Sequence, residues 1–556
     1  MLIKTRKNHM KPLSATLSTS ERPYTLPAGM TERVHELMEA ARVPGLSLAI
    51  YSRDEILYCE GLGVKSTEGG QAVDEETIFC AASLGKPAFA YALLQLVDRG
   101  LMGLDDPLYQ YLPHPDLQHD ERHRLLTARM VLEHTTGLPN VRKDGRLDFE
   151  YEPGERHEYS GEAFNYLMRV LEKLTGQDLE TMMQALVFQP LGMTNSSYLW
   201  QERFEENYAV SHHDIGWRFP RYRPTDYNAA YSLQTTARDY AQLMMALLNG
   251  QGLKEETARA FFQPAVELAR LPDGSSASWG LGIGLLNTAQ ERYCWQWGGH
   301  NWFASFTISL LDSGLGLIYL SNAMSGFGIA KALIESCFGA EKTPTPWLGD
   351  YDYQAPHKDF LNRLLRDFDF NKAVQPFLDE GGERYRPELL DEDSVEQVGL
   401  LMYEVRDTRL AQQIFEVNQR THPHSAQAQE NYGLACLSNR EQAKAARHFK
   451  RAYELDPNRD YCRHISAQLE GHASGNVTFR LKGHYHAKSI SVAGDFNGWN
   501  SFHHPFRREE GEWVCHLQLA PGTYEYKLIV DRVWILDPHN PRSVYREEHN
   551  SVLEVQ

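Results

Sequence analysis

The pattern of apolar and polar positions divides the chain into three parts. Over residues 29–342, helical spacing at both ends and in the middle accompanies short apolar runs that cluster late, which favours an α+β domain. Residues 31–42 and 328–338 are expected to be helices, and 46–51 with 56–61 a β-hairpin. Later strands are expected at 279–286, 293–297, 304–311 and 315–322.

Helical patterning with an internal period follows this first part. Scattered prolines mark a linker, so residues 343–393 are expected to hold a linker and a helical segment. Within residues 394–472, Gly399 and Gly433 lie 34 positions apart, and two prolines repeat the same separation. A period near 34 with paired helices resembles tetratricopeptide repeats, and a generic helical spacer is the alternative.

Short, closely spaced strands are expected over residues 475–556. This part holds the turn Gly494 to Trp499, and its other motifs are Pro521-Gly522, Tyr524 to Lys527, Trp534, Asp537-Pro538 and Asn550-Ser551-Val552. On these residues it resembles the glycogen-binding module of AMP-activated kinase β subunits and starch-branching enzymes. The resemblance implies an immunoglobulin-like β-sandwich.

Composition narrows the class of protein. The 556 residues are enough for three or four domains, and the formal net charge of −18 argues against a general binder of nucleic acid or anionic membranes. Residues 1–28 are expected to be a loose leader that is not a secretory signal, because no apolar stretch follows its basic residues. Seven scattered cysteines without a C-x-x-C pair predict reduced thiols and a cytoplasmic protein.

One short motif carries candidate chemistry. Ser83 and Lys86 are three residues apart, followed by an apolar run with helical spacing at 87–97, which predicts both side chains on one face at the start of a buried helix. A lysine beside a serine can activate its hydroxyl as a nucleophile. The motif alone favours a capped helix with an exposed lysine, so further motifs are needed to support a nucleophile.

An ordered series of motifs supports the chemical interpretation. The series runs Ser83 to Lys86, Gly103 to Pro107 with Tyr111-Leu112-Pro113, Glu133 to Pro139, Pro153-Gly154, Tyr159-Ser160-Gly161 and Pro190 to Met193. In this order the motifs resemble the serine β-lactamase, penicillin-binding-protein and esterase superfamily, in its class C-like branch. Two positions depart from the family pattern: Gly161 replaces the usual Asn, and Trp297-Gly298-Gly299 stands where Lys-Thr-Gly or His-x-Gly is usual.

The resemblance implies roles for individual residues. Ser83 would be the acylated nucleophile, Lys86 its proton partner, and Tyr159 a second base acting as a phenolate stabilised by Lys86 or through a hydrogen bond to the serine. The oxyanion hole would combine the N–H of Ser83 with a backbone N–H just after Trp297-Gly298-Gly299, such as that of His300. The alternative for Tyr159 is a half-buried tyrosine at a helix entry.

The Trp297 departure bears on the substrate. In β-lactam-recognising relatives a basic residue there helps to hold a substrate carboxylate, whereas tryptophan offers an indole N–H and an apolar face. Esters or amides with a neutral flank are therefore expected, and β-lactam turnover is expected to be weak or absent. Core packing of Trp295 and Trp297 is the alternative.

In the C-terminal module the resemblance implies a surface for α-1,4-glucan. Trp499 and Trp534 would offer flat faces to sugar rings, and Lys527 and Asn550 would hydrogen-bond hydroxyl groups. A β-sandwich that has lost its ligand is the alternative.

Metal and cofactor chemistry is not expected. His212-His213-Asp214 and His503-His504 lack metal-site spacing to a second cluster, and no Gly-rich phosphate loop occurs between a strand and a helix.

The sequence therefore predicts a cytoplasmic serine hydrolase, an esterase or amidase acting through an acyl-enzyme on Ser83. Its C-terminal module would hold it near glycogen or a starch-like glucan, and its helical repeats could bind a protein partner. The rival interpretation is a catalytically retired, glycogen-docked scaffold that recruits partners through the repeats. The natural substrate and the oligomeric state do not follow from the sequence.

Overall fold

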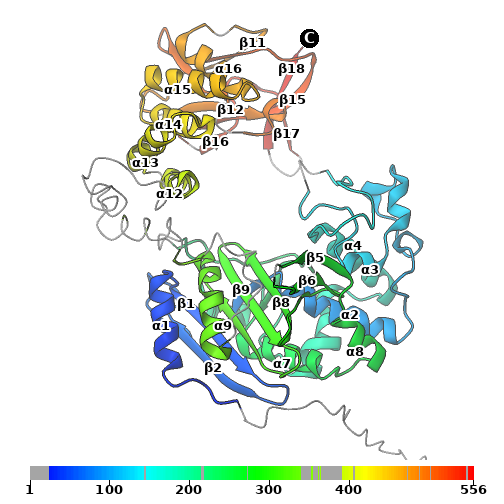
Figure 1. Cartoon of the computed structure of the whole chain (residues 1–556). Helices are drawn as coiled ribbons and strands as arrows, with labels where there is room; N and C mark the ends of the chain where they lie inside the picture. The colour runs from blue at the N-terminus through cyan, green and yellow to red at the C-terminus, as the bar shows by residue number, and fades with distance from the viewer. Residues whose placement is uncertain are drawn as a thin grey trace, which may run out of the picture. The chain divides into compact units, whose positions relative to one another are not determined.

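The computed structural model of the chain forms two compact units, residues 1–353 and 354–556, each described by itself (Figure 1). The structure describes residues 24–142, 146–213, 218–271, 273–339, 352–354, 361, 364, 391–404, 407–472, 474–487, 489–500, 503–531, 533–545 and 549–555. Residues 1–23 of the expected leader and most of the expected segment 343–393 lie outside the described residues. No helix in the described ranges is long and apolar enough to cross a membrane.

The first unit is built on an eight-stranded antiparallel sheet with the strand order β2-β1-β10-β9-β8-β7-β6-β5. The strands of this unit are β1 (Gly45–Tyr51), β2 (Ile56–Gly63), β3 (Phe79–Ala82), β4 (Leu233–Thr235), β5 (Val266–Arg270), β6 (Ser276–Trp279), β7 (Gly284–Asn287), β8 (Arg292–His300), β9 (Phe303–Leu310) and β10 (Gly316–Ser321). The described helices are α1 (Met30–Ala40), α2 (Gly85–Asp98), α3 (Ala128–Leu132), α4 (Gly161–Thr175), α5 (Leu179–Met183), α6 (Gln189–Leu191), α7 (Ala237–Leu248), α8 (Glu255–Phe261) and α9 (Ala330–Phe338).

Helices cover both faces of this sheet. The apolar side chains of α1 and α9 share one buried core with the sheet, and those of α2, α4 and α7 share the other (Figure 1). Strands β1, β9 and β10 are buried along their whole length, as expected for strands enclosed on both faces. The expected α+β domain is confirmed, and its sheet lies between two helical layers.

One expected strand is wrong in detail. The sequence pattern predicted a single strand over 279–286, but the chain forms β6 and β7 with a tight turn between them. Gly282 has φ of 92°, which favours glycine, and a Cβ there would lie 2.8 Å from that of Ala90. The turn therefore brings the sheet against α2, the helix that follows Ser83.

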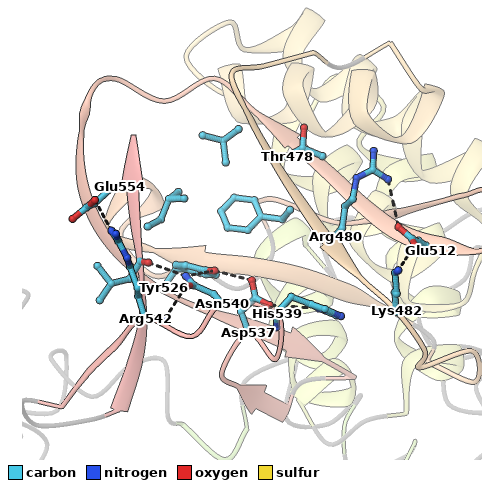
Figure 2. A pocket seen from close by; sticks show the side chains of 14 residues that line it. Thr478, Arg480, Lys482, Glu512, Tyr526, Asp537, His539, Asn540, Arg542 and Glu554 are labelled. Atoms are coloured by element: carbon cyan, nitrogen blue, oxygen red, sulfur yellow. Dashed lines mark hydrogen bonds and ion pairs between the residues drawn. The ribbon is translucent and has the colours of Figure 1, made fainter. Parts of the chain in front are cut away.

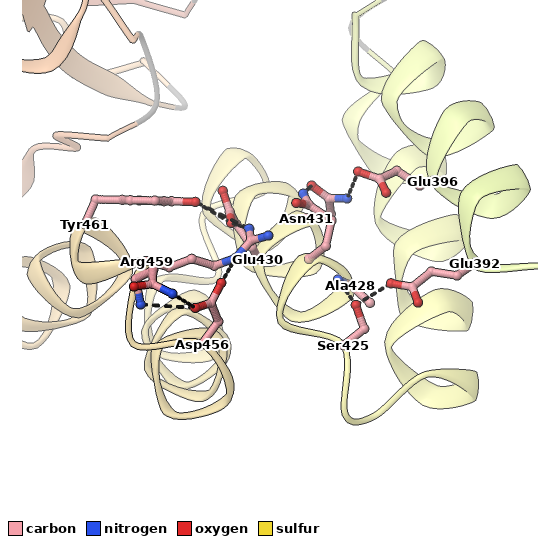
Figure 3. A network of polar contacts seen from close by, with 11 residues as sticks. Glu392, Glu396, Ser425, Ala428, Glu430, Asn431, Asp456, Arg459 and Tyr461 are labelled. Atoms are coloured by element: carbon pink, nitrogen blue, oxygen red, sulfur yellow. Dashed lines mark hydrogen bonds and ion pairs between the residues drawn. The ribbon is translucent and has the colours of Figure 1, made fainter. Parts of the chain in front are cut away.

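The second unit begins with five described helices that pack as antiparallel neighbours: α12 (Glu392–Glu404), α13 (Thr408–Thr421), α14 (Ala426–Ser438), α15 (Gln442–Leu455) and α16 (Asp460–Glu470). Figure 3 shows polar contacts that join alternate helices: Asn431 of α14 donates to Glu396 of α12 at 2.9 Å, and Tyr461 of α16 donates to Glu430 of α14 at 2.6 Å. Because Glu430 and Asn431 are buried, these contacts satisfy groups that water does not reach.

Two antiparallel sheets with a shared apolar core complete the second unit, in the orders β11-β14-β13 and β12-β15-β18-β17, with β16 beside β15. The strands are β11 (Val477–Leu481), β12 (Ile490–Gly494), β13 (Arg507–Glu509), β14 (Glu512–Leu517), β15 (Gly522–Val530), β16 (Val533–Ile535), β17 (Ser543–Tyr545) and β18 (His549–Val555). Helix α16 packs on β14, where the buried Gln468 donates to the carbonyl of Val514 at 3.0 Å and accepts from the N–H of His516 at 3.2 Å.

Candidate functional site

Ser83 lies in the turn between β3 and α2. The sequence predicted it on the helix, but α2 begins at Gly85, so the serine precedes the first helical residue. Ala82 has φ of 50°, a left-handed conformation that turns the chain sharply before the serine. Two tyrosine hydroxyls hold the start of the helix: Tyr240 donates to the carbonyl of Leu84 at 3.0 Å, and Tyr198 to that of Gly85 at 2.7 Å.

Lys86 lies beside the serine and is buried. Its Nζ is 3.1 Å from Ser83 Oγ and 3.0 Å from the carbonyl oxygen of Ala230. The side chain is 2% exposed, and burial lowers the pKa of Lys86 to about 7 because the ammonium is removed from water. The alternative of an exposed lysine is therefore wrong. A lysine with this pKa is partly neutral near pH 7 and can accept a proton.

Tyr159 is presented at the entry to α4. Ser160 caps this helix, since its Oγ accepts from the N–H of Ala163 at 3.1 Å. The ring of His134 stacks on the tyrosine with centroids 4.3 Å apart, and the N–H of Ser160 donates to His134 Nδ1 at 3.0 Å. His134 thus fixes both the ring and the backbone around Tyr159.

The surroundings of Tyr159 raise its pKa, which favours the hydrogen-bonded phenol among the two roles expected for it. Burial raises its pKa above the ordinary value, and the contacts with Ser83 and Gln296 offset this only in part. Lys86 Nζ lies 4.5 Å from the centre of the ring, over its face. The lysine therefore contacts the π-face of the phenol ring.

Gln296 of β8 was missed by the sequence reasoning. It is fully buried, and its Nε2 donates to the hydroxyl of Tyr159 at 2.9 Å. Side chains alternate along a strand, so Gln296 and Gly298 share the face toward β3, while Trp297 and Gly299 share the other. This alternation, counted back from the Trp297-Gly298-Gly299 motif, could have identified Gln296.

The two glycines of the Trp297-Gly298-Gly299 motif face opposite sides of β8. A Cβ on Gly298 would lie 2.3 Å from the carbonyl oxygen of Ala81 and 2.9 Å from the nitrogen of Ser83, so only glycine lets β8 approach the serine. Gly299 faces away, toward Met324 and Phe327, with its Cβ position 3.3 Å from each. The part of β8 beyond Trp295 pairs only with β9 in the described structure, because β7 begins at Gly284, opposite Trp295.

Aromatic rings line the rest of the site. Trp297 stacks on Tyr159 with centroids 5.5 Å apart and on Trp295 at 5.3 Å, so it both packs on the core and borders the site. His300 contacts the ring of Tyr231 at 4.5 Å, and burial lowers its pKa, which favours the neutral imidazole. That the N–H of His300 contributes to an oxyanion hole stays a prediction.

Three of the four expected sugar-contact residues, Lys527, Trp534 and Asn550, lie on one sheet of the second unit, and Trp499 lies in a turn that follows β12. The rings of Trp499 and Trp534 are 6.2 Å apart, and Trp534 is 43% exposed. Trp534 of β16 pairs with Ile529 of β15, and Ile529 and Lys527 are two positions apart on the same face of β15. Asn550 lies on β18, the other neighbour of β15. The structure therefore brings the four together.

Two carboxylates in this region were missed by the sequence reasoning. Asp495 accepts from the indole N–H of Trp499 at 3.1 Å and from the backbone N–H of Glu525 at 2.7 Å. Glu525 in turn accepts from the amide of Asn550 at 2.9 Å. Asp495 thus orients Trp499 relative to the sheet.

A cleft of about 800 Å³ lies elsewhere in the same unit (Figure 2). Its lining comes from β11, β14, β15, β18 and the loop before β17, and includes none of the four expected sugar-contact residues. Its charged groups pair with one another, as in Arg542 with Glu554, and Tyr526 donates to Asp537 at 2.7 Å. The cleft is therefore a feature separate from the tryptophan pair.

The histidine clusters have structural partners. His212 accepts from the N–H of Thr67 at 3.1 Å, and His503 stacks on Tyr461 with centroids 4.1 Å apart, whereas Asp214 lies outside the described residues. No group of three or more metal-ligating side chains occurs in the described part of the chain.

Comparison with known proteins gives two family matches. The family described as Beta-lactamase matches residues 30–335, and the family described as the glycogen recognition site of AMP-activated protein kinase matches residues 477–556. The first match contains Ser83, Lys86, Tyr159 and Gln296, and the second contains both tryptophans of the pair.

Individual relatives resemble the first unit. The chain is 31% identical over 210 residues to Esterase EstB of Burkholderia gladioli, covering 32% of this chain and 53% of that protein. It is 23% identical over 323 residues to Penicillin-binding protein 4* of Bacillus subtilis (strain 168), covering 51% and 69%. It is 23% identical over 224 residues to Protein flp of Staphylococcus aureus, covering 37% and 44%. The chain thus spans about half the length of the first curated relatives it matches.

A solved structure shares the fold of this part. The octameric penicillin-binding protein homologue from Pyrococcus abyssi superposes with a TM-score of 0.50 at 19% identity, covering 60% of this chain and 81% of that chain. At this identity the likeness concerns the fold alone.

Proposed function

Because the chain belongs to the beta-lactamase family and carries a glycogen-recognition module, we propose that it is an esterase or amidase that acts through an acyl-enzyme on Ser83 and is held near α-glucan. The observation that carries this proposal is the buried Lys86, whose Nζ lies 3.1 Å from Ser83 Oγ with a pKa lowered to about 7. A base with a pKa near the working pH is suited to take the serine proton.

The reaction is a two-step acyl transfer. Ser83 Oγ attacks the substrate carbonyl carbon, its proton passes to Lys86, and the leaving group departs with a proton, which leaves an acyl-serine. Water then attacks the acyl carbonyl and regenerates the serine. The N–H of Ser83, together with a backbone N–H from the end of β8, would stabilise the oxyanion of each tetrahedral intermediate.

The surroundings favour a neutral substrate. Among the described residues, the groups that contact Tyr159 besides Lys86 and Ser83 are the amide of Gln296 and aromatic rings. Burial keeps the nearby His134 neutral by lowering its pKa. A free carboxylate on the substrate would have no matching cation among these contacts. The similarity to Esterase EstB also favours an ester. We therefore expect short neutral esters to be hydrolysed and cephalosporins to be turned over poorly.

The second unit would hold the hydrolase near an α-glucan. The tryptophan pair of the module, with Lys527 and Asn550 on the sheet that carries Trp534, supports binding of an α-glucan such as glycogen. The two sheets with a shared core are consistent with an immunoglobulin-like sandwich. Binding there raises the local concentration of the hydrolase near the polymer without a part in the chemistry. Seven free cysteines fit the proposed reducing, cytoplasmic setting.

The helical segment has the internal equivalence expected of repeats. Gly399 of α12 faces the ring of Phe415, and Gly433 of α14 faces that of Phe449, so the same glycine–phenylalanine contact recurs after 34 residues. This supports tetratricopeptide-like repeats that bind a protein partner. Crosslinking of the full chain in extract, with partner crosslinks concentrated on α12–α16, would test that role.

The rival proposal of a retired scaffold loses one of its supports. A Cβ on Gly161 would lie 2.7 Å from the carbonyl oxygen of Asn140, so close packing explains the departure from the usual Asn. Hydrolysis of p-nitrophenyl butyrate by the full chain, abolished in Ser83→Ala, would support the hydrolase. Wild-type protein without activity toward any ester or amide would favour the scaffold.

A further inference from the structure

Gln296 connects the hydroxyl of Tyr159 with the backbone carbonyls of Ser83 and Trp297. Its Nε2 lies 2.9 Å from the Tyr159 hydroxyl, 3.0 Å from the carbonyl oxygen of Trp297 and 3.4 Å from the carbonyl oxygen of Ser83. Its Oε1 is buried and has no hydrogen-bond partner among the described residues. The orientation of the amide is therefore set on the Nε2 side.

These contacts fix which way the amide points. Carbonyl oxygens only accept hydrogen bonds, so the group that faces Ser83 O and Trp297 O has to be the NH₂ group. If the amide were reversed, the Oε1 of this fully buried side chain would face two carbonyl oxygens. The Tyr159 oxygen consequently accepts a hydrogen bond from Gln296. Its own O–H is left to point elsewhere, and Ser83 is the other polar side chain with which the phenol interacts.

We propose that Gln296 is a positioning residue that holds Tyr159 as a neutral proton donor toward Ser83 Oγ, and that Lys86 is consequently the base that activates the serine. The inference rests on the proposed hydrolase function. Of the two roles that the resemblance implies for Tyr159, it selects the hydrogen bond to the serine over the phenolate, because an amide supplies a hydrogen bond without the positive charge that would stabilise a phenolate.

The charge state of the neighbours agrees with this assignment. Burial raises the pKa of Tyr159 and lowers that of Lys86 to about 7, so near pH 7 the phenol keeps its proton while the amine can lose one. The carbonyl of Ala230 accepts an N–H of Lys86 and leaves the amine lone pair available to Ser83. The titratable groups on adjoining elements, His134 and His157, have lowered pKa values because of burial and stay neutral.

The proton balance is closed in each step. In acylation the bond between Ser83 Oγ and the carbonyl carbon forms, and the serine proton moves to Lys86. When the bond to the leaving oxygen breaks, that oxygen takes the proton of Tyr159, and Tyr159 recovers one from the Lys86 ammonium. In deacylation water attacks the acyl carbon and gives its proton to Tyr159, which passes one to neutral Lys86, and the departing Ser83 oxygen takes it back. No proton is gained or lost over the cycle.

A double-mutant cycle on the full chain tests the inference. Hydrolysis of p-nitrophenyl butyrate would be measured against pH for the wild type, Gln296→Met, Tyr159→Phe and the double variant, with fluorophosphonate labelling of the wild type as a check on Ser83. Gln234→Met is the matched control, because Gln234 is also a buried glutamine that bonds a tyrosine, in this case Tyr208 at 2.7 Å.

The expected result is that Gln296→Met lowers kcat by about 10-fold to 100-fold with little change in KM, as expected for loss of a positioned proton donor. In the Tyr159→Phe background the same substitution of Gln296 should leave kcat unchanged. The rate of hydrolysis should still fall below about pH 7 in Gln296→Met, as in the wild type. The inference would be overturned if the decreases in kcat of the two single variants multiplied in the double variant. It would also be overturned if the low-pH decrease of the Gln296→Met rate profile moved to higher pH, since that result would make Tyr159 the base.

Two further outcomes remain decisive. If Gln296→Met does not fold, near-ultraviolet difference spectra of the wild type against Tyr159→Phe serve instead. A tyrosinate signal at pH 8 would contradict a neutral phenol, and its absence would support one. If the wild type shows no fluorophosphonate adduct, the proposed function itself fails. If the adduct forms but the kcat losses of the two single variants multiply in the double variant, only the role of Gln296 is overturned.

Discussion

Lys86 Nζ lies 3.1 Å from Ser83 Oγ. The other groups around the Lys86 amine are uncharged: the carbonyl of Ala230 and the rings of Tyr159 and Phe164. A lysine normally stays charged near pH 7, with a pKa near 10.4. Here removal from water lowers the pKa of Lys86 to about 7. The fold thus places a partly neutral amine next to a hydroxyl at the start of a helix.

The first prediction concerns pH. The rate of ester hydrolysis, as kcat/KM, should fall about tenfold per pH unit below about pH 7, because the ammonium form of Lys86 cannot take the serine proton. Above that pH the rate should level off. The pH profile of the full chain measures this, and an acid limb near pH 4 or 5 would point instead to a carboxylate base.

The second prediction concerns stability. A lysine whose pKa is lower in the folded than in the unfolded chain destabilises the fold at low pH, and stability rises as pH increases from about 7 toward the unfolded value. Lys86→Met should therefore abolish activity yet raise the free energy of unfolding at pH 6, by at most roughly 5 kcal/mol at 1.36 kcal/mol per pKa unit. The lost hydrogen bonds to Ser83 and Ala230 reduce this gain.

Urea unfolding at pH 6 and pH 9 measures the effect. The gain should shrink at the higher pH, and Lys331→Met, on an exposed lysine of α9, should show no such trend. A Lys86→Met protein that is less stable than the wild type at pH 6 would contradict the assignment of the lowered pKa.

The third prediction compares two adjacent glycines. Gly298→Ala places a Cβ 2.3 Å from the carbonyl oxygen of Ala81 and 2.9 Å from the Ser83 nitrogen, so backbone has to move. Activity should fall at least about 100-fold, and stability by about 1–3 kcal/mol. Gly299→Ala meets Met324 and Phe327 at 3.3 Å on the opposite face, and should keep activity within about tenfold. Similar losses in both variants would show that β8 does not set the position of Ser83.

The fourth prediction concerns the glucan surface. Trp499→Ala and Trp534→Ala should each weaken co-sedimentation with glycogen about tenfold, because each removes an aromatic face for a sugar ring. Ester hydrolysis should be unchanged. Tyr485→Ala serves as a control within the module, since Tyr485 is 64% exposed and is not among the four expected sugar-contact residues. Unchanged glycogen binding by both tryptophan variants would contradict a glucan-binding surface at Trp499 and Trp534.

The sequence was informative where a short pattern specifies a local structure. The hairpin of β1 and β2, the strand β9 and the helix α9 follow from short apolar runs and helical periodicity, because β1 and β9 are buried along their whole length and α9 buries one face. The proximity of Ser83 and Lys86 follows from their spacing across a helix start. The single strand expected over 279–286 failed because two glycines there allow a turn that periodicity does not reveal.

Other features depend on contacts between distant segments. Gln296 and Tyr159 are 137 residues apart, and their hydrogen bond exists only because β8 and the entry of α4 meet beside Ser83. Burial of Lys86 likewise arises from the surrounding core, so its lowered pKa could not follow from spacing. For the same reason, the sequence left open whether Tyr159 acts as a phenolate or through a hydrogen bond to the serine, since the burial that raises its pKa comes from distant segments.

The most direct test of the central claim is the intact mass of the full chain after exposure to a fluorophosphonate, for the wild type, Ser83→Ala and Ser336→Ala as a control serine of α9. An activated Ser83 predicts one adduct on the wild type and on Ser336→Ala, and none on Ser83→Ala. No adduct on folded wild-type protein, or an adduct that survives in Ser83→Ala, would contradict the claim that Ser83 is the nucleophile.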